Sequence, residues 1–98
     1  MIKWSKRSIR RRQQCVIYIA KESQDWLTAW RWEDDVFESV ERLEDFPESG
    51  SIVREIGRDD IREIFVGDYR IIYRIRRHAP EILTVRHTRR LITTLQAL

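Results

Sequence analysis

The fold of this chain is decided by residues 61–76, which read Ile61-Arg62-Glu63-Ile64-Phe65-Val66-Gly67-Asp68-Tyr69-Arg70-Ile71-Ile72-Tyr73-Arg74-Ile75-Arg76. Branched and aromatic residues dominate both halves of this stretch, and Gly67-Asp68 separates them as a two-residue turn. The pattern predicts a hairpin of two strands, Ile61–Val66 and Tyr69–Arg76. A third strand, Ile82–His87, follows a turn at residues 77–80, so that the three strands form an antiparallel meander.

The N-terminal half of the chain has helical periodicity. Ile2–Trp4 is short and β-prone, which favours an edge strand, and Ser5 suits a helix N-cap. Apolar residues then recur at helical spacing on both sides of a polar break at residues 22–25, and Pro47 ends the pattern. We expect one helix after Ser5 and a second over Trp26–Asp45. The residues predicted to face the core are Ile9, Val16, Ile19, Ala20, Ala29, Val36, Phe37, Val40 and Leu43.

These elements predict an α+β fold in a single domain, residues 1–98. Because the break between the two helices is short, they should form an antiparallel hairpin, packed on one face of the antiparallel sheet. Leu91, Ile92, Leu95 and Leu98 also have helical spacing, which allows a short C-terminal helix.

Composition indicates a globular protein of a reduced cytoplasm. Apolar residues make up 42% and charged residues 36% of the chain. No apolar run approaches the roughly 18–20 residues that span a bilayer, and no signal-peptide pattern is visible. The single cysteine, Cys15, has no partner for a disulfide. With two histidines and no clustered thiols, the sequence predicts no metal site and no cofactor.

The charges are segregated along the chain. Residues 1–21 carry seven Lys and Arg and no acid, residues 22–60 carry thirteen acids and four arginines, and residues 61–98 carry eight arginines and three acids. This pattern is informative about binding partners. Either the basic segments meet an anionic partner, or the three segments neutralise one another in the folded chain. The role of the basic stretch Lys6–Arg12 is left open.

The strand after the turn carries a row of arginines. Strand alternation directs Tyr69 and Tyr73 towards the helices, and Arg70, Arg74 and Arg76 to the opposite face. Side chains two residues apart lie about 7 Å from each other, close to the phosphate spacing of nucleic acids. Residues expected to extend the row are Arg62, Arg86, Arg89 and Arg90. The alternative is a solvated face of an antiparallel sheet.

Two further features allow a functional and a structural interpretation. His87 could donate a proton in RNA cleavage while Arg70 stabilises the phosphate charge, or it could simply be a hydrogen-bonded residue at a strand end. Trp26 and Trp30 share a helix face, where they either pack in the core or form a groove for a partner helix.

The whole chain resembles the ParE/RelE family of bacterial toxins. The residues that carry the resemblance are Phe46-Pro47-Glu48-Ser49-Gly50, then Ile61-Arg62-Glu63, then Val66-Gly67-Asp68-Tyr69-Arg70-Ile71-Ile72-Tyr73-Arg74-Ile75, then Ile82-Leu83-Thr84-Val85-Arg86-His87-Thr88-Arg89-Arg90. Ile2-Lys3-Trp4-Ser5 and Tyr18-Ile19-Ala20 resemble the first strand and the first helix of the same family. The resemblance implies the same fold as the periodicity, a helical hairpin against an antiparallel sheet. It also implies a cognate antitoxin whose extended segment wraps the toxin. We expect that contact at Trp26, Trp30, Arg74 and Arg76.

The family divides according to what the toxin attacks. The Phe46–Gly50 loop and the ending Val85-x-His87-x-x-Arg90 resemble the ParE branch, which inhibits DNA gyrase without catalysis of its own. This implies target contacts at Arg62, Arg70, Arg74, Arg86, His87, Arg89 and Arg90. The alternative is a RelE-like, ribosome-dependent mRNA endonuclease with Arg70 and His87 as catalytic residues. Against it, no lysine follows Lys21, and the only candidates for a general base are Glu55 and Glu63.

A third hypothesis is a degenerate family member that binds its antitoxin and is not toxic. Growth arrest on induction of the toxin alone would argue against that hypothesis. We favour the gyrase inhibitor.

Overall fold

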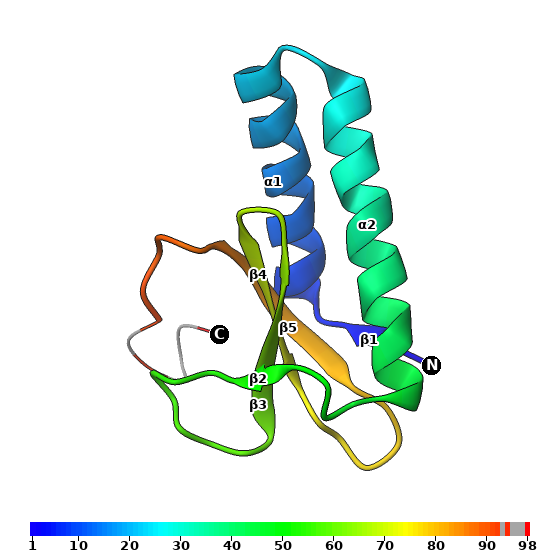
Figure 1. Ribbon diagram of the computed structural model, residues 1–98, viewed down its shortest axis with the longest axis vertical. Helices are drawn as coiled ribbons and strands as arrows, with labels where there is room; N and C mark the ends of the chain where they lie inside the picture. Colours follow the sequence, from blue (N-terminus) through cyan, green and yellow to red (C-terminus); the bar gives the residue numbers. More distant parts are fainter. Residues whose placement is uncertain (93, 95–97) are drawn as a thin grey trace.

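The computed structural model describes residues 1–92, 94 and 98, and it consists of a helical hairpin and a five-stranded sheet (Figure 1). The predicted α+β fold is confirmed. Half of the segment predicted as a C-terminal helix, residues 93 and 95–97, lies outside the described residues. In chain order the elements are β1 (Lys3–Trp4), α1 (Lys6–Ser23), α2 (Trp26–Asp45), β2 (Ser51–Ile52), β3 (Ile61–Val66), β4 (Tyr69–Arg74) and β5 (Glu81–His87).

The sheet is mixed, with the strand order β1-β5-β4-β3-β2. The strands from β2 to β5 pair antiparallel, as the hairpin signals predict, whereas β1 runs parallel to β5. The predicted wholly antiparallel sheet is therefore wrong at this edge. Because β1 and β5 come from opposite ends of the chain, no tight turn fixes their relative direction. The N–H of Ser5 donates to the carbonyl of Ile82, and its hydroxyl donates to that of Leu83.

Capping residues set the helix ends. The Ser5 side chain accepts the N–H of Ser8 at the start of α1. At the other end, Gln24 adopts a left-handed conformation with φ 55°, and Asp25 then caps α2 by accepting the N–H of Leu27. The polar break thus ends one helix and starts the next within two residues. This forces the antiparallel hairpin, whose tip projects beyond the sheet (Figure 1).

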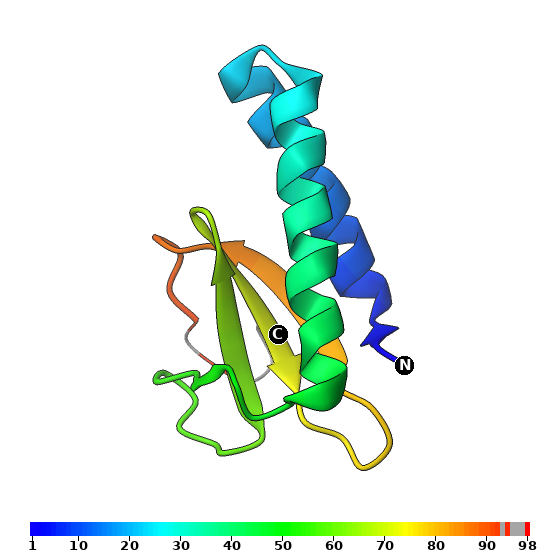
Figure 2. The same cartoon turned by 45° about the vertical axis from the view of Figure 1, so that its right-hand side comes forward.

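The main core lies between the hairpin and one sheet face, a layering that is visible in Figure 2. Most of the predicted stripe is buried there, although Ile9 is 36% and Phe37 is 38% exposed. Trp32, which lies outside the predicted stripe, is also buried. It packs on Tyr69, with ring centroids 5.0 Å apart, and its indole N–H donates to the Val66 carbonyl at 3.1 Å. This contact holds α2 against the turn between β3 and β4.

The second face of the sheet is covered as well. Val53, Ile61, Ile72 and Ile92 form a smaller core there, and each is at most 1% exposed. The segment after β2 and the segment after β5 therefore fold over the sheet face opposite the helices, which the sequence alternation predicts to be accessible. These segments also cover the side chains beside the smaller core, and Arg70 is buried as a result.

The loop between α2 and β2 is fastened by one tyrosine. The Tyr73 hydroxyl donates to the Pro47 carbonyl at 2.6 Å and accepts the Gly50 N–H at 3.0 Å. A Cβ on Gly50 would lie 2.5 Å from that hydroxyl and 2.7 Å from the Glu63 carbonyl. Only glycine therefore fits at this position. The Phe46–Gly50 motif has a structural role, which is to close the loop against β4.

Candidate functional site

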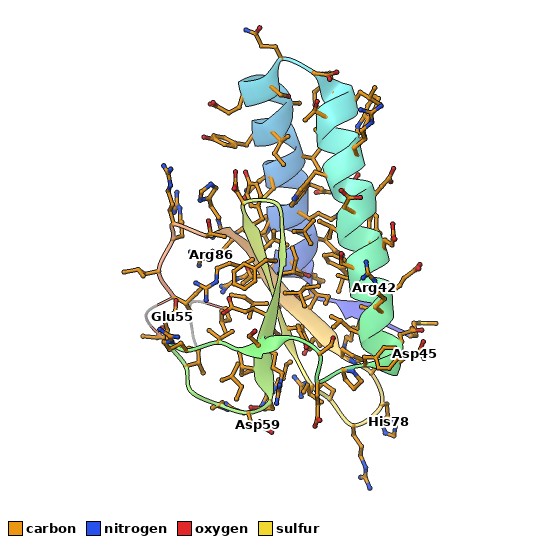
Figure 3. All side chains as sticks on the ribbon, viewed as in Figure 1. Arg42, Asp45, Glu55, Asp59, His78 and Arg86 are labelled. Atoms are coloured by element: carbon orange, nitrogen blue, oxygen red, sulfur yellow. The ribbon has the colours of Figure 1, made fainter. Side chains whose placement is uncertain are left out.

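The structure divides the predicted arginines among three places. Arg62 and Arg74 lie at the end of the sheet that holds the loop around Asp59 (labelled in Figure 3), and both are ion-paired. Arg62 bonds to Asp59 at 2.8 Å and also donates to backbone carbonyls, including that of Gly50 at 3.1 Å. Arg74 lies 3.2 Å from Asp60. These two arginines fasten loops at this end of the sheet.

Arg70 is buried in the middle of the covered face. The residue is only 6% exposed, and its guanidinium binds two carboxylates, those of Glu63 and Glu55. The contacts to Glu55 are bidentate, at 2.9 and 3.1 Å. Hydrogen bonds from Arg70 lower the pKa of Glu55 to about 2, so that the pair is charged throughout the physiological range. The predicted continuous row of accessible arginines is therefore wrong at its centre.

The Arg70–Glu55 pair also anchors the segment that follows β5. Arg70 donates to the Arg90 carbonyl at 3.4 Å, and Glu55 accepts the Ile92 N–H at 3.3 Å. The Ile92 side chain is buried in the second core. The ion pair consequently fixes the path of the backbone that carries Arg89 and Arg90.

The remaining predicted residues come together in a cleft between α1 and the end of β5. This basic cleft has a volume of about 490 Å³. Its lining residues are Arg11, Gln14, Cys15, Tyr18, Tyr69, Val85, Arg86, His87, Arg89 and Arg90. Four of these ten are arginines, and no carboxylate among the described residues lines the cleft. Figure 3 labels Arg86 at this part of the molecule, away from Asp59 and His78 at the other end of the sheet.

The positive charges gathered in the basic cleft affect the pKa of one of its side chains, Arg86. Burial lowers the pKa of Arg86, and the neighbouring Arg11 and Arg90 lower it further. Within the described part of the chain, no carboxylate forms an ion pair with Arg11, Arg89 or Arg90. An anion that entered the cleft would relieve this repulsion.

His87 is held by its neighbours. Its ring packs edge-on against Tyr69, with centroids 5.3 Å apart, and its Nδ1 accepts the N–H of Arg89 at 3.1 Å. The strand register pairs His87 with Tyr69 and Arg70 with Arg86, and therefore His87 and Arg70 point to opposite faces of the sheet. The structure therefore does not bring the two residues of the predicted catalytic pair together on one face of the sheet.

The residues predicted for antitoxin contact are not gathered in one place. Trp26 and Trp30 are 51% and 54% exposed, with ring centroids 6.0 Å apart, near the tip of the hairpin. The core-packing interpretation of these two tryptophans is therefore wrong. Arg74 and Arg76 lie at the opposite end of the molecule, where Arg76 pairs with Glu81 at 2.9 Å. Of the residues predicted for antitoxin contact, Trp26 and Trp30 form an exposed surface that stays a candidate for this contact.

Sequence reasoning missed the contribution of α1 to the basic cleft. Arg11, Cys15 and Tyr18 follow one another at helical spacing, and this signal places them on one face of the helix. Arg12, one residue further, points elsewhere and stacks on the Trp4 and Phe37 rings at 4.6 Å from each centroid. The basic stretch Lys6–Arg12 thus supplies one cleft residue, Arg11, and one packing residue, Arg12.

The described residues contain no group of three or more metal-binding side chains. Among the helices of the described chain, none combines the length and apolarity needed to cross a bilayer.

One comparison with known proteins shows the family of this chain, and another shows its fold. The family model of the ParE toxin of the type II toxin–antitoxin system parDE matches residues 2–92. A solved structure described as the chromosomal ParDE toxin–antitoxin system from P. aeruginosa superposes with a TM-score of 0.72 at 15% identity, covering 88% of this chain and 92% of the other. Comparison with curated protein sequences finds no match. The structural likeness shows the fold alone, and the family model extends over nearly the whole chain. The chain belongs to the ParE toxin family of type II toxin–antitoxin systems.

Proposed function

We propose that this chain inhibits DNA gyrase in the cytoplasm and is held inactive by a cognate antitoxin. The observation that carries the proposal is the basic cleft, where Arg11, Arg86, Arg89 and Arg90 meet with no carboxylate among the lining residues that the structure describes. Gyrase works on DNA, and a cluster of arginines suits a phosphate-bearing or acidic surface. His87 shapes the wall of the cleft between Tyr69 and Arg89.

The buried arginine argues against the mRNA endonuclease. An endonuclease of that type needs an accessible cation for the phosphate and a free carboxylate as general base. Arg70, Glu55 and Glu63 are the candidates, and they are held together in one ion-paired cluster, in which Arg70 and Glu63 are buried and the Glu55 side chain is 26% exposed. The proposed inhibitor therefore acts by binding its target.

Antitoxin contact is proposed at the exposed tryptophan pair. Trp26, Trp30 and Leu27 expose about half of their surfaces on neighbouring turns of α2. Aromatic anchors of this kind suit the apolar face of a partner helix. Arg74 and Arg76 take part in this contact only if the antitoxin also extends to the far end of the sheet.

The test is a supercoiling assay with purified toxin, run beside an mRNA cleavage assay with translating ribosomes. We expect inhibited supercoiling and intact mRNA. The double variant Arg89→Ala and Arg90→Ala should reduce inhibition, and Arg77→Ala serves as the matched control because Arg77 is exposed outside the basic cleft. Codon-positioned mRNA cuts with normal supercoiling would refute the proposal. Absence of growth arrest on induction would favour the non-toxic family member.

A further inference from the structure

A second groove lies on the side of the sheet opposite the basic cleft, between the last turns of α2 and β3. It has a volume of about 490 Å³, and its walls come from α2, from the loop after α2 and from β3. Phe46 at the end of α2 and Phe65 on β3 both line it. Since β4 separates β3 from β5, this edge groove and the basic cleft are separate surfaces.

Large apolar side chains are exposed at this edge of the sheet. Phe46 is 65% and Phe65 is 58% exposed, and Ile52 on the neighbouring strand β2 is 42% exposed. Exposed aromatic side chains beside a hollow are typical anchors of a contact between proteins. The edge groove therefore has the character of a binding surface.

The strand β3 has unpaired length at the same edge. β2 is only two residues long, and it pairs Ser51 with Glu63 and Ile52 with Arg62. No described strand pairs with Phe65 on this side. An unpaired strand edge is a template for a further strand, and β3 therefore offers one beside the groove.

The phase of the ladder shows where the backbone of Phe65 points. Val66 and Tyr69 flank the two-residue turn as a hydrogen-bonded pair, so that Phe65 belongs to the alternate set, which bonds away from β4. Ile61 belongs to the same set, and its carbonyl accepts the N–H of Val53 on the β2 side at 3.0 Å. The N–H and carbonyl of Phe65 thus face the edge groove, and no described strand or loop bonds to them.

The charges that line the edge groove are already balanced. Arg42 and Glu63 are its charged lining residues within the part of the chain that the structure describes. Arg42 lies 3.9 Å from Glu38, and Glu63 is bound by the buried Arg70. The interior of the groove therefore favours apolar side chains and backbone hydrogen bonds.

The rim of the edge groove is acidic. Asp45 and Glu48 line a hollow that adjoins the groove at Phe46, and both are exposed. Among the described residues, no cation forms an ion pair with either carboxylate. Figure 3 labels Asp45 at the end of α2, away from Arg86. Such a rim repels nucleic acid and attracts lysine and arginine side chains.

We propose that the edge groove binds an extended basic segment of the target protein, which adds to β3 as a strand. Its apolar side chains pack on Phe46 and Phe65, its backbone bonds to that of Phe65, and its lysines or arginines meet Asp45 and Glu48. Strand addition of this kind is a common mode of peptide recognition. A second copy of the chain fits less well, because a twofold contact at the groove brings two acidic rims together.

The inference rests on the proposed function, because it takes the target to be gyrase, an enzyme that works on DNA. Proteins that hold DNA carry lysines and arginines beside the phosphates. A toxin with a basic cleft on one side of the sheet and an acidic rim on the other can contact both the phosphates and those basic side chains. The two surfaces together would place the chain at the boundary between protein and DNA.

The first experiment uses the full chain and a labelled seven-residue peptide of alternating Lys and Val at low salt. Fluorescence anisotropy should show binding, and the amide hydrogen exchange of Phe65 should slow. The double variant Phe46→Ala and Phe65→Ala should bind about tenfold more weakly, and Asp45→Asn with Glu48→Gln about three- to tenfold more weakly. Ile17→Ala, which removes an exposed apolar side chain of α1 outside the groove, is the matched control and should bind like the wild type.

The second experiment measures inhibition of gyrase supercoiling by the same variants. The double variant Phe46→Ala and Phe65→Ala should need about tenfold more toxin for half-inhibition, whereas Ile17→Ala should match the wild type. Full inhibition by the double variant would remove this inference and leave the proposed function. No inhibition by the wild type would refute the proposed function and with it the identity of the partner, whereas the peptide experiment still decides whether the groove binds a basic strand.

Three results of the binding experiments would overturn the inference. A peptide of alternating Glu and Val that binds as tightly as the Lys peptide would remove the role of the acidic rim. Absence of binding, or binding without slower exchange at Phe65, would show that the edge groove is not the site. A dimer of the free chain in sedimentation that the double variant Phe46→Ala and Phe65→Ala loses would assign the groove to a second copy.

Discussion

The ion pair between Glu55 and Arg70 makes a prediction about acid stability. Hydrogen bonds from Arg70 lower the pKa of Glu55 from 4.5 to about 2. A carboxyl group with a depressed pKa stabilises the fold fully above its unfolded pKa, and this contribution is lost as the pH falls from about 4.5 through about 2. At about 1.4 kcal/mol per pKa unit, the shift corresponds to at most about 3 kcal/mol. The Glu55 side chain is 26% exposed, and solvent screening reduces our expectation to about 1–2 kcal/mol.

The perturbation is Glu55→Gln, which keeps the shape of the side chain and removes its charge. At pH 7 the variant should be less stable than the wild type by about 1–2 kcal/mol in urea unfolding followed by circular dichroism. Because protonated Glu55 resembles glutamine, the two stability curves should converge as the pH falls towards 2. Glu41→Gln, on the exposed side of α2, is the matched control and should follow the wild type. A gap that stays constant from pH 7 to pH 2.5, or no gap at pH 7, would refute the reasoning.

Three further predictions concern stability and thiol reactivity. Tyr73→Phe should destabilise the fold by about 1–3 kcal/mol in urea unfolding, because it leaves the Gly50 N–H without its partner. Gly50→Ala should cost about 2–3 kcal/mol by the same measurement, since its Cβ meets the Tyr73 hydroxyl at 2.5 Å, and the double variant should be less than additive. Burial raises the pKa of Cys15 to about 11, and iodoacetamide should therefore label it about 100-fold more slowly at pH 7.5 in the folded chain than in urea; equal rates would contradict this.

Local signals in the sequence predicted most of the fold. Ser5 begins the first helix, the second helix spans Trp26–Asp45 as expected, and Gly67-Asp68 makes the turn of the hairpin. Each of these depends on residues only a few positions apart. The strand after the turn ends at Arg74, two residues earlier than predicted, beside an irregularity in the pairing of β4 with β5. The parallel pairing of β1 with β5 joins residues about 78 positions apart, and no local pattern encodes its direction.

The candidate site was predicted only in part, for a related reason. Alternation placed Arg70 on the correct face, away from the helices, but it could not show that Glu55 and Ile92 fold over that face. Likewise, the helical spacing of Trp26 and Trp30 gives their shared face and does not say whether another element covers it. Segments distant in sequence decide whether a side chain is covered, and local periodicity carries no information about these segments.

The segregation of charge along the chain can now be interpreted in space. Much of the acidic middle segment is used internally, since Glu55 binds Arg70, Asp59 binds Arg62 and Asp60 binds Arg74. Mutual neutralisation therefore applies to the centre of the sheet and to one of its ends. It does not extend to the basic cleft, where Arg89 and Arg90 meet an arginine from the basic N-terminal segment. Two basic segments from opposite ends of the chain thus converge in a cleft that no described carboxylate lines, although Glu22 and Asp68 line the hollow next to it, and this asymmetry is the physical reason to expect an anionic partner there.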